Sequence, residues 1–334
     1  MSFDVHCGDC LDVMAEMEEN SVDLIATDPP YYRVKDEPWD KQWDTPEGFI
    51  AWIGQLCEQW QRILRPNGSL YVFASPKMAA RVECEVGRWF NVLNHVVWRK
   101  PSSRHNQADA TKLRGYFPQT ERIIFAEHFG ADNIAKGEAG YTAKCDELRG
   151  FVFEPLRAYL ASEWERAGLT RADADKATNS FMSGHYLSSV QWALPTREKY
   201  EQLRAYANAN GQNHGGDYLR REYEDLRREY EDLRRPFSVT ADAPYTDVWD
   251  FATVQAYPGK HPCEKPVEMM RHIVLASSRE GDTVLDPFMG SGSTGCAAVQ
   301  EGRDFIGIEL DAEYCEIARR RIEHWARQPV LEMV

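Results

Sequence analysis

The two ends of the sequence alternate short apolar runs with stretches of helical periodicity, and this alternation most narrows the folds open to the chain. Val22–Thr27 (VDLIAT) is an apolar run that stops at Asp28-Pro29-Pro30. Apolar residues then recur at helical spacing over Phe49–Leu64, and after Pro66-Asn67-Gly68 the run Ser69–Ala74 has the composition of a buried strand. Strands and helices that alternate in this way favour an α/β fold, a doubly wound and mostly parallel sheet covered by helices.

Four further strand candidates lie on either side of a long helical stretch. They are Val92–Trp98, Arg122–Ala126, Thr283–Leu285 and Phe305–Glu309. Each of the two α/β segments is short for a complete doubly wound sheet, so we expect the segments to complete one another in one Rossmann-like sheet.

The sequence therefore predicts one α/β domain made of residues 1–130 and 245–334, interrupted by a helical insert at 131–244. Within the insert, Arg221–Arg227 (REYEDLR) is repeated as Arg228–Arg234. We expect a helix that begins near Asp217 and stops at Pro236. Its apolar stripe would either join two protomers or pack within its own domain, and consists of Leu219, Tyr223, Leu226, Tyr230 and Leu233.

Hydropathy and cysteine usage limit the class of protein. No run approaches the about 18–20 apolar residues of a membrane span, and the start MSFDVHCGDC lacks the regions of a signal peptide. We therefore expect a cytoplasmic protein that contacts no membrane. Of the eight cysteines only Cys7 and Cys10 form a C-x-x-C, with no second pair near enough for a zinc site, so we expect reduced structural thiols and no metal.

The formal charge of −14 argues against a protein that simply coats DNA, because phosphate binding rests on Lys and Arg. One stretch, residues 99–114, departs from this average, with five basic residues against one acidic residue. It is either a solvated loop or a surface that faces a phosphate backbone. Its basic residues, which we take as candidate DNA contacts, are Arg99, Lys100, Arg104, Lys112 and Arg114.

The motif Asp28-Pro29-Pro30-Tyr31 follows a strand, where doubly wound proteins place their active sites. An aryl amine is a poor nucleophile because its lone pair is delocalised into the ring. A hydrogen-bond acceptor at Asp28, with the carbonyl of Pro29, would draw that lone pair back onto nitrogen. Tyr31 would stack on a base extruded from the duplex. A simple turn after a strand is the alternative interpretation.

A glycine-rich turn over Asp286–Thr294 (DPFMGSGST) follows the strand candidate that ends at Leu285. Glycines at 290 and 292 let the backbone approach a ligand, and Asp286 could pair with a cationic α-amino group. Neither a Walker lysine nor a full G-x-G-x-x-G is present, which weakens ATP and NAD as ligands. Glu309 ends the next strand, where an acid can accept both hydroxyls of a ribose. The turn therefore favours an adenosine ligand, and a tight turn with a capping acid is the alternative.

Four motifs occur in one order: Phe3–Tyr31, His261–Pro266 (HPCEKP), DPFMGSGST and Ile306–Leu310 (IGIEL). In this order they resemble the β class of S-adenosylmethionine-dependent DNA amino-methyltransferases, in which the catalytic segment precedes the cofactor-binding segment. The resemblance covers residues 1 to about 128 and about 245 to 325.

The resemblance implies methyl transfer from S-adenosyl-L-methionine to an amine of a flipped base in double-stranded DNA, by a restriction-modification or orphan methylase that forms a homodimer. Asp rather than Ser at position 28 leans toward adenine N6 over cytosine N4. The implied catalytic residues are Asp28, Pro29, Pro30 and Tyr31. The implied cofactor-binding residues are Asp9, Lys265, Asp286, Phe288, Gly290, Ser291, Gly292, Thr294 and Glu309.

The insert occupies the place of the target-recognition region in that family. Thr170 is a helix N-cap candidate, and Ser180–Gln191 looks similar to the second and third helices of a phage-repressor helix-turn-helix. His185, Tyr186 and Gln191 would then reach the DNA. An ordinary pair of packed helices is the alternative, since no Arg or Lys lies between Asn179 and Trp192.

Other functions remain as alternatives to the adenine-N6 enzyme. The nearest is a cytosine-N4 methyltransferase. A catalytically silent DNA-binding regulator is disfavoured because Asp28, Tyr31 and Asp286 are all intact. An RNA or protein amide methyltransferase would use the same chemistry, but the helical insert favours duplex DNA, because sequence-specific RNA readers more often address unpaired bases.

Overall fold

The computed structural model describes residues 2–34, 37–101, 111, 114–116, 118–131, 141–148, 152–181, 183–188, 192–212, 217–239, 245–255, 257 and 262–328. Its contacts divide the chain into two compact units. The α/β unit combines Met1–His128 with Pro236–Val334, and the helical unit is Phe129–Arg235. The α/β unit thus resumes at Pro236, whereas the sequence placed this junction at residue 245.

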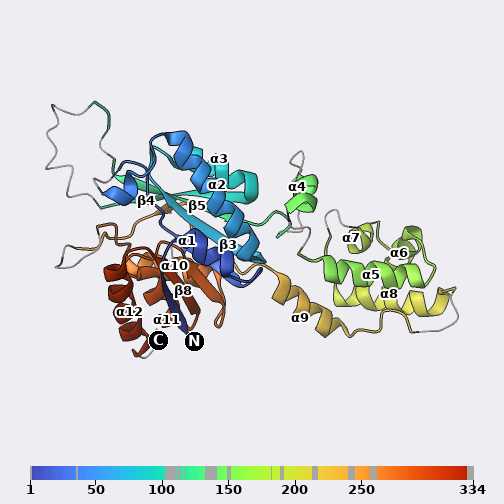
Figure 1. Ribbon diagram of the computed structural model, residues 1–334. Helices are drawn as coiled ribbons and strands as arrows, with labels where there is room; N and C mark the ends of the chain where they lie inside the picture. Colours follow the sequence, from blue (N-terminus) through green and yellow to red (C-terminus); the bar gives the residue numbers. More distant parts are fainter. Residues whose placement is uncertain are drawn as a thin grey trace. The chain divides into compact units, whose positions relative to one another are not determined.

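A single sheet forms the centre of the α/β unit (Figure 1). Its described strands are β1 (Phe3–Cys7), β2 (Val22–Thr27), β3 (Leu64–Ala74), β4 (Asn91–Arg99), β5 (Thr120–Glu127), β6 (Val248–Trp249), β7 (Thr283–Asp286) and β8 (Asp304–Glu309). The order is β1-β8-β7-β2-β3-β5-β4-β6, and among these strands only β5 runs antiparallel to its neighbours. The predicted doubly wound, mostly parallel sheet is confirmed. Because β7 and β8 lie between β1 and β2, the two chain segments complete one sheet.

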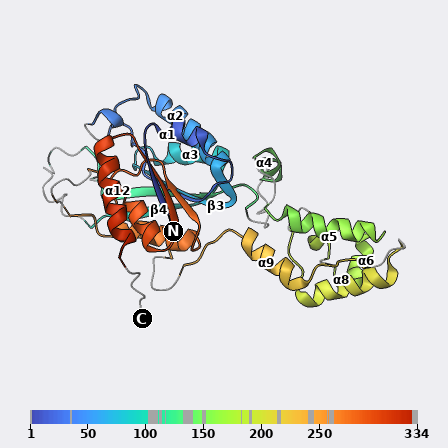
Figure 2. The same cartoon turned by 60° about the horizontal axis from the view of Figure 1, so that its bottom comes forward.

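Helices cover both faces of this sheet (Figures 1 and 2). One face carries α1 (Cys10–Glu16), α2 (Pro46–Ile63) and α3 (Ala79–Trp89), and the other carries α10 (Val267–Ser277), α11 (Ser293–Gln300) and α12 (Ala312–Ala326). Every residue of β2 is buried. Leu24 and Ala26 pack in the core beneath α10 and α11, whereas Ile25 packs beneath α2. Successive side chains of β2 therefore pack alternately into the cores on the two faces of the sheet. This explains why the apolar run of β2 is uninterrupted.

The sequence missed β1 and β6 and began β3 too late. The strand pairs with β2 from Leu64 onward, five positions before the predicted start at Ser69. A register shift between the pairs at Val22 and Leu24 accommodates the Pro66-Asn67-Gly68 turn signal inside the strand. Tertiary pairing has overridden a local signal that usually ends an element.

The helical unit has a core of its own. Its described helices are α4 (Tyr141–Leu148), α5 (Glu154–Arg166), α6 (Arg171–Thr178), α7 (Gly184–Leu187), α8 (Arg197–Asn210) and α9 (Tyr223–Leu233). Leu160 and Trp164 of α5 pack with Tyr200 and Leu203 of α8 in its centre. None of the helices in the described part of the chain is long and apolar enough to cross a membrane.

The predicted helix over residues 217–236 was wrong at its start. Asp217 and Leu219 have positive φ angles of 54° and 52°, and α9 begins only at Tyr223. The amide of Leu219 donates to Glu163 Oε2 at 2.8 Å, which holds this turn against α5. Leu219 and Leu226 are buried in the core of the helical unit. The stripe therefore packs within its own domain, the second of the two options that the sequence left open.

Candidate active site

Four loops meet at the carboxyl edge of the parallel strands. Asp28 follows β2, Asp286 ends the neighbouring β7, Glu309 ends β8, and Gly8-Asp9 follows β1. The chain leaves β2 and β7 toward opposite faces of the sheet, and such a switch point opens a crevice. A cavity of about 890 Å³ lies there. Its size falls within the usual range for small-molecule sites.

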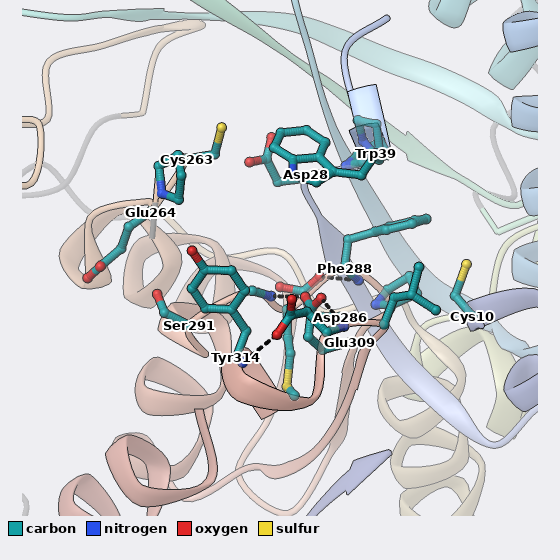
Figure 3. Close-up of a pocket in the computed structure, with 18 of the residues that line it drawn as sticks. Cys10, Asp28, Trp39, Cys263, Glu264, Asp286, Phe288, Ser291, Glu309 and Tyr314 are labelled. Atoms are coloured by element: carbon teal, nitrogen blue, oxygen red, sulfur yellow. Dashed lines mark hydrogen bonds between the residues drawn. The ribbon is translucent and has the colours of Figure 1, made fainter. Parts of the chain in front are cut away.

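The cavity brings together the catalytic motif Asp28–Tyr31 and the glycine turn Asp286–Thr294, which are more than 250 positions apart in the sequence. In Figure 3, Asp286, Phe288 and Glu309 gather on one side of the cavity, and Asp28 with Trp39 lies across from them. Gly292 is the one predicted catalytic or cofactor residue that does not line it. The predicted residues that do are Asp9, Asp28, Pro29, Pro30, Tyr31, Lys265, Asp286, Phe288, Gly290, Ser291, Thr294 and Glu309.

The glycine turn has a shape that other residues would not allow. Gly292 has a φ of 82°, and a Cβ there would lie 3.0 Å from the Cβ of Ala318. The amides of Gly290 and Asp311 donate to separate oxygens of Glu309, each at 2.9 Å. Glu309 thus holds the turn in place. Each of its carboxylate oxygens keeps a lone pair for a hydroxyl of a ligand.

Asp286 is 4% exposed and lies under this turn. Its Oδ2 accepts from the hydroxyl of Thr294 at 2.5 Å, and its Oδ1 accepts from the amide of Phe288 at 3.1 Å. Burial raises the pKa of Asp286 to about 7, against the lowering effect of these hydrogen bonds. A carboxylate in this setting is stabilised by a cationic partner, such as the ammonium group of an amino acid.

The catalytic candidates form a polar cluster with three residues from elsewhere in the chain, Lys265, Glu121 and Lys100. Asp28 accepts from the hydroxyl of Tyr31 through Oδ1 and from the ammonium of Lys265 through Oδ2. Glu121, at the start of β5, lies 3.2 Å from the Tyr31 hydroxyl and 3.6 Å from Lys265 Nζ. Lys100 donates to the other oxygen of Glu121. Lys265, which the resemblance placed with the cofactor, therefore bonds to Asp28.

A second carboxylate, Asp40, fixes the loop that follows the catalytic motif. It is fully buried, and it accepts from the amide of Tyr31 at 2.7 Å and from that of Val34 at 2.5 Å. Between these amides, Tyr32 and Arg33 adopt positive φ angles of 62° and 57°. The clamp holds the backbone of Tyr31 in a strained turn, and the adjacent Trp39 lines the cavity.

Sequence reasoning missed Asp40, Trp39 and Glu121. The signal for Glu121 was available, because it is an acid at the entry to the apolar run Arg122–Ala126. Since β5 is antiparallel, its first residues lie at the edge where the parallel strands end. Without knowledge of the direction of β5, Glu121 looks like an acidic residue at an exposed strand end.

The candidate DNA contacts are only partly described. Arg99 forms an ion pair with Asp250 at 2.6 Å, Lys100 pairs with Glu121, and Arg114 is exposed. The other candidates, Arg104, Lys112 and Gln191, lie outside the described residues.

The predicted N-cap at Thr170 is confirmed, whereas the described part of residues 180–191 contains one short helix where the helix-turn-helix likeness implied two. Thr170 begins α6 as predicted, in a capping box with Asp173. The helix that should follow, α7, is a single turn, and Ser188 after it is extended. His185 and Tyr186 lie on this turn and are half-buried, and Tyr186 packs on the core of the helical unit. The described residues between 180 and 191 thus form no helix longer than this single turn.

Comparisons with known proteins agree with this geometry. A family model described as DNA methylase matches residues 22–320. The DNA adenine methyltransferase YhdJ of Escherichia coli (strain K12) is 24% identical over 324 residues, which cover 95% of this chain and 81% of that protein.

Solved structures show the same fold at lower sequence identity. TTHA0409 of Thermus thermophilus, in complex with S-adenosyl-L-methionine, has a TM-score of 0.50 and 18% identity, with 97% of this chain and 94% of that chain covered. The cytosine-N4-specific PvuII DNA methyltransferase has a TM-score of 0.53 and 14% identity, with 96% and 86% covered.

Proposed function

Because this chain belongs to the DNA methylase family, we propose that it transfers a methyl group from S-adenosyl-L-methionine to N6 of adenine in duplex DNA. The observation that carries the proposal is the pairing of β2 with β7. It brings a carboxylate suited to a cation, Asp286, and a carboxylate suited to an amine, Asp28, to one cavity. In a methyl transfer, Asp286 would bind the sulfonium donor, and Asp28 would bind the amino group that accepts the methyl.

The residues of the glycine turn fit the cofactor. The backbone at Gly290, together with Ser291 and Thr294, lines the cavity and suits the methionine end, whose ammonium would pair with Asp286. Phe288 would lie at the methionine end, Glu309 would accept the ribose hydroxyls, and Asp9 would lie beside the adenine. When bound, the cofactor supplies a methyl group made electrophilic by its sulfonium sulfur.

The other side of the cavity would hold the target base. An aryl amine that donates to Asp28 and to the carbonyl of Pro29 regains lone-pair density on nitrogen as it attacks. Pro30 stiffens this turn. Stacking on Tyr31 would contribute about 1–3 kcal/mol, comparable with the few kcal/mol needed to extrude the base from the duplex.

Adenine is proposed on two grounds, the aspartate at position 28 and the adenine specificity in the name of the Escherichia coli relative. The cytosine-N4-specific structural neighbour keeps cytosine N4 as the second candidate. Incubation of the protein with isotope-labelled cofactor and mixed duplex DNA, followed by digestion to nucleosides, decides between them. Label in N6-methyl-2′-deoxyadenosine is the expected result. Label in N4-methyl-2′-deoxycytidine would select the second candidate, and unlabelled DNA would contradict both.

The helical unit is proposed to choose the DNA sequence, since every catalytic and cofactor candidate lies in the α/β unit. His185, Tyr186 and Gln191 would contact base edges. The basic residues at Arg99–Arg114 would position the phosphate backbone, and among those described both Arg99 and Arg114 are exposed.

We further propose a homodimer in the cytoplasm, where its DNA substrate would be found. This proposal rests on the family resemblance, because Leu219 and Leu226 are already buried within one chain. Sedimentation should give a dimer at micromolar concentration. A monomer both with and without DNA would contradict it.

A further inference from the structure

A tyrosine hydroxyl and a lysine ammonium lie between two buried carboxylates beside the cavity. The hydroxyl of Tyr31 donates to Asp28 Oδ1 and is 3.2 Å from Glu121 Oε2. The ammonium of Lys265 donates to Asp28 Oδ2 and is 3.6 Å from the same oxygen of Glu121. The family motifs supply three members of this cluster, and Glu121 comes from β5, outside all of them.

The charged side chains of the cluster are largely enclosed. The side chains of Lys265, Glu121 and Asp28 are 8%, 14% and 16% exposed. Lys265 Nζ also lies over the rings of Tyr31 and Phe73, at 5.4 and 5.1 Å from their centroids. Lys100 completes the charge balance at Glu121, so two carboxylates face two ammonium groups. Removing one charge here leaves its partner without compensation.

Hydrogen-bond capacity distinguishes the two donors. A hydroxyl has one proton, so Tyr31 donates to Asp28 or to Glu121 but not to both. An ammonium has three, and Lys265 has three acceptors within reach: Asp28, Glu121 and the carbonyl of Cys263 at 3.5 Å. When a target amine donates to Asp28, the hydroxyl of Tyr31 can donate to Glu121 instead. Lys265 can bridge the two carboxylates throughout.

On the basis of the proposed function, we propose that Glu121 and Lys265 are positioning residues of the methyl-transfer site. Lys265 orients Asp28 and keeps it a charged acceptor, and Glu121 takes the Tyr31 hydroxyl as the base displaces it from Asp28. Lys265 lines the cavity, but in this proposal neither residue acts directly on the cofactor or the base. Both act through Asp28 and Tyr31.

The two residues bias Asp28 in opposite directions. The groups that face its carboxylate are Tyr31, Lys265, Glu121 and Asp286, with the Cys263 thiol next to Lys265. Burial raises the pKa of Asp28, the Lys265 ammonium counters that rise, and the Glu121 carboxylate adds to it. Lys265→Met should therefore raise this pKa further, whereas Glu121→Gln should lower it.

The test compares Lys265→Met, Glu121→Gln and a control, Glu301→Gln. The control removes a carboxylate from an enclosed ion pair with Arg271 in the same unit, away from the cavity. The first measurement is independent of activity: the carboxyl resonance of Asp28 in 13C-aspartate-labelled protein, assigned by its loss in Asp28→Asn, is titrated with pH. We expect shifts of about one pH unit or more, upward for Lys265→Met and downward for Glu121→Gln, the usual effect of a charge within about 4–6 Å. The control should not shift.

The second measurement is the single-turnover rate of methyl transfer against pH, together with cofactor affinity by calorimetry. The acid limb of the rate should move in the same directions as the resonance, while cofactor affinity stays within about twofold of wild type. Variants that titrate like wild type, or that both move the same way, would overturn the proposal, as would a loss of cofactor affinity in Lys265→Met. Opposite shifts of the resonance in a protein that labels no DNA would instead sink the proposed function and leave the charge arrangement standing. Thermal unfolding of each variant separates these effects from loss of fold.

Discussion

Asp28 and Asp286 end neighbouring strands and are both enclosed, yet their surroundings give them different tasks. Asp28 bonds to a lysine ammonium and a tyrosine hydroxyl, whereas the hydrogen-bond donors to Asp286 are a threonine hydroxyl and a backbone amide. Asp286 would gain a cationic partner when the ligand binds, whereas Asp28 needs only a neutral hydrogen-bond donor. Mutating each carboxylate alone should therefore distinguish their two functions.

Asp28→Ala should reduce methyl transfer by roughly a hundredfold or more, because the acceptor that activates the amine is lost. Cofactor affinity should change little, since Asp28 acts on the base. Single-turnover rates and calorimetry on the same preparation check the two halves of this prediction. Turnover near the wild-type rate would remove Asp28 from the mechanism.

Glu309→Ala should have the reverse effect. It removes the proposed acceptor for the ribose hydroxyls and also frees the amide of Gly290 that Glu309 holds. We expect cofactor binding to weaken by about 1.5–3 kcal/mol, the range for hydrogen bonds to a charged group. Calorimetry that gives an unchanged affinity would assign Glu309 a structural role alone.

Cofactor binding should depend on pH through Asp286, whose pKa burial raises to about 7. Below that pH the carboxyl is neutral in the free protein and must lose its proton to pair with an ammonium. Affinity should therefore rise up to about tenfold per pH unit below pH 7 and level off above it. Calorimetry between about pH 5.5 and 7.5 measures this slope, and Asp286→Asn should flatten it.

The same raised pKa has a consequence for stability. The folded state holds this proton more tightly than the unfolded chain does, so between about pH 4 and pH 7 the folded state binds more protons. The contribution of Asp286 to the free energy of unfolding therefore falls as pH rises through that window. Bound cofactor should offset the loss.

At the scale of elements, the reversed direction of β5 decides what reaches the site. Its first residues lie beside the end of β3, at the same edge of the sheet where β2 and β7 end, so Glu121 enters a site otherwise built from the ends of parallel strands. The end of β4 lies at the same edge, which brings Lys100 to Glu121. A parallel β5 would have carried Glu121 to the opposite edge of the sheet.

The capping box at the start of α6 offers a test of the helical unit. Asp173 accepts from both the amide and the hydroxyl of Thr170, and the indole of Trp164 donates to the carbonyl of Thr170 at 2.9 Å. Thr170→Ala should lower the free energy of unfolding by about 1 kcal/mol, and Thr170→Ser should retain most of it. Denaturant unfolding followed by tryptophan fluorescence reports on this region. Equal destabilisation in both variants would argue that the hydroxyl contributes nothing.

At the scale of the whole molecule, catalytic chemistry and the proposed recognition occupy different compact units. Alanine at His185 or Tyr186 should relax or shift the preferred DNA site, because each direct hydrogen bond to a base contributes about 1–3 kcal/mol of discrimination. Arg114→Ala should weaken binding to all sequences alike and reduce its salt dependence. A survey of methylated sites by sequencing compares the variants. If the His185 and Tyr186 variants methylate the wild-type DNA sequence and Arg114→Ala methylates a different one, the helical unit does not choose the DNA sequence.

The sequence by itself determined the fold class and the two motifs that line the cavity. Apolar periodicity located most strands of the sheet, and the motifs after Thr27 and Leu285 mark strand ends, where parallel sheets place ligands. These inferences succeed because they depend on neighbours along the chain. The N-cap at Thr170 is local in the same sense, and it was found where it was predicted.

Only the tertiary structure decided which charged residues form ion pairs and which apolar residues pack in the same core. Lys265 meets Asp28 across 237 positions, and Glu121 joins them because β5 runs backward. The stripe at Leu219–Leu233 packs inward because a turn at Leu219 is held by Glu163 of another helix. Strand order, strand direction and the partners of a buried charge are set by contacts between distant segments. Local periodicity does not encode those contacts, because it reflects only which face of an element is apolar.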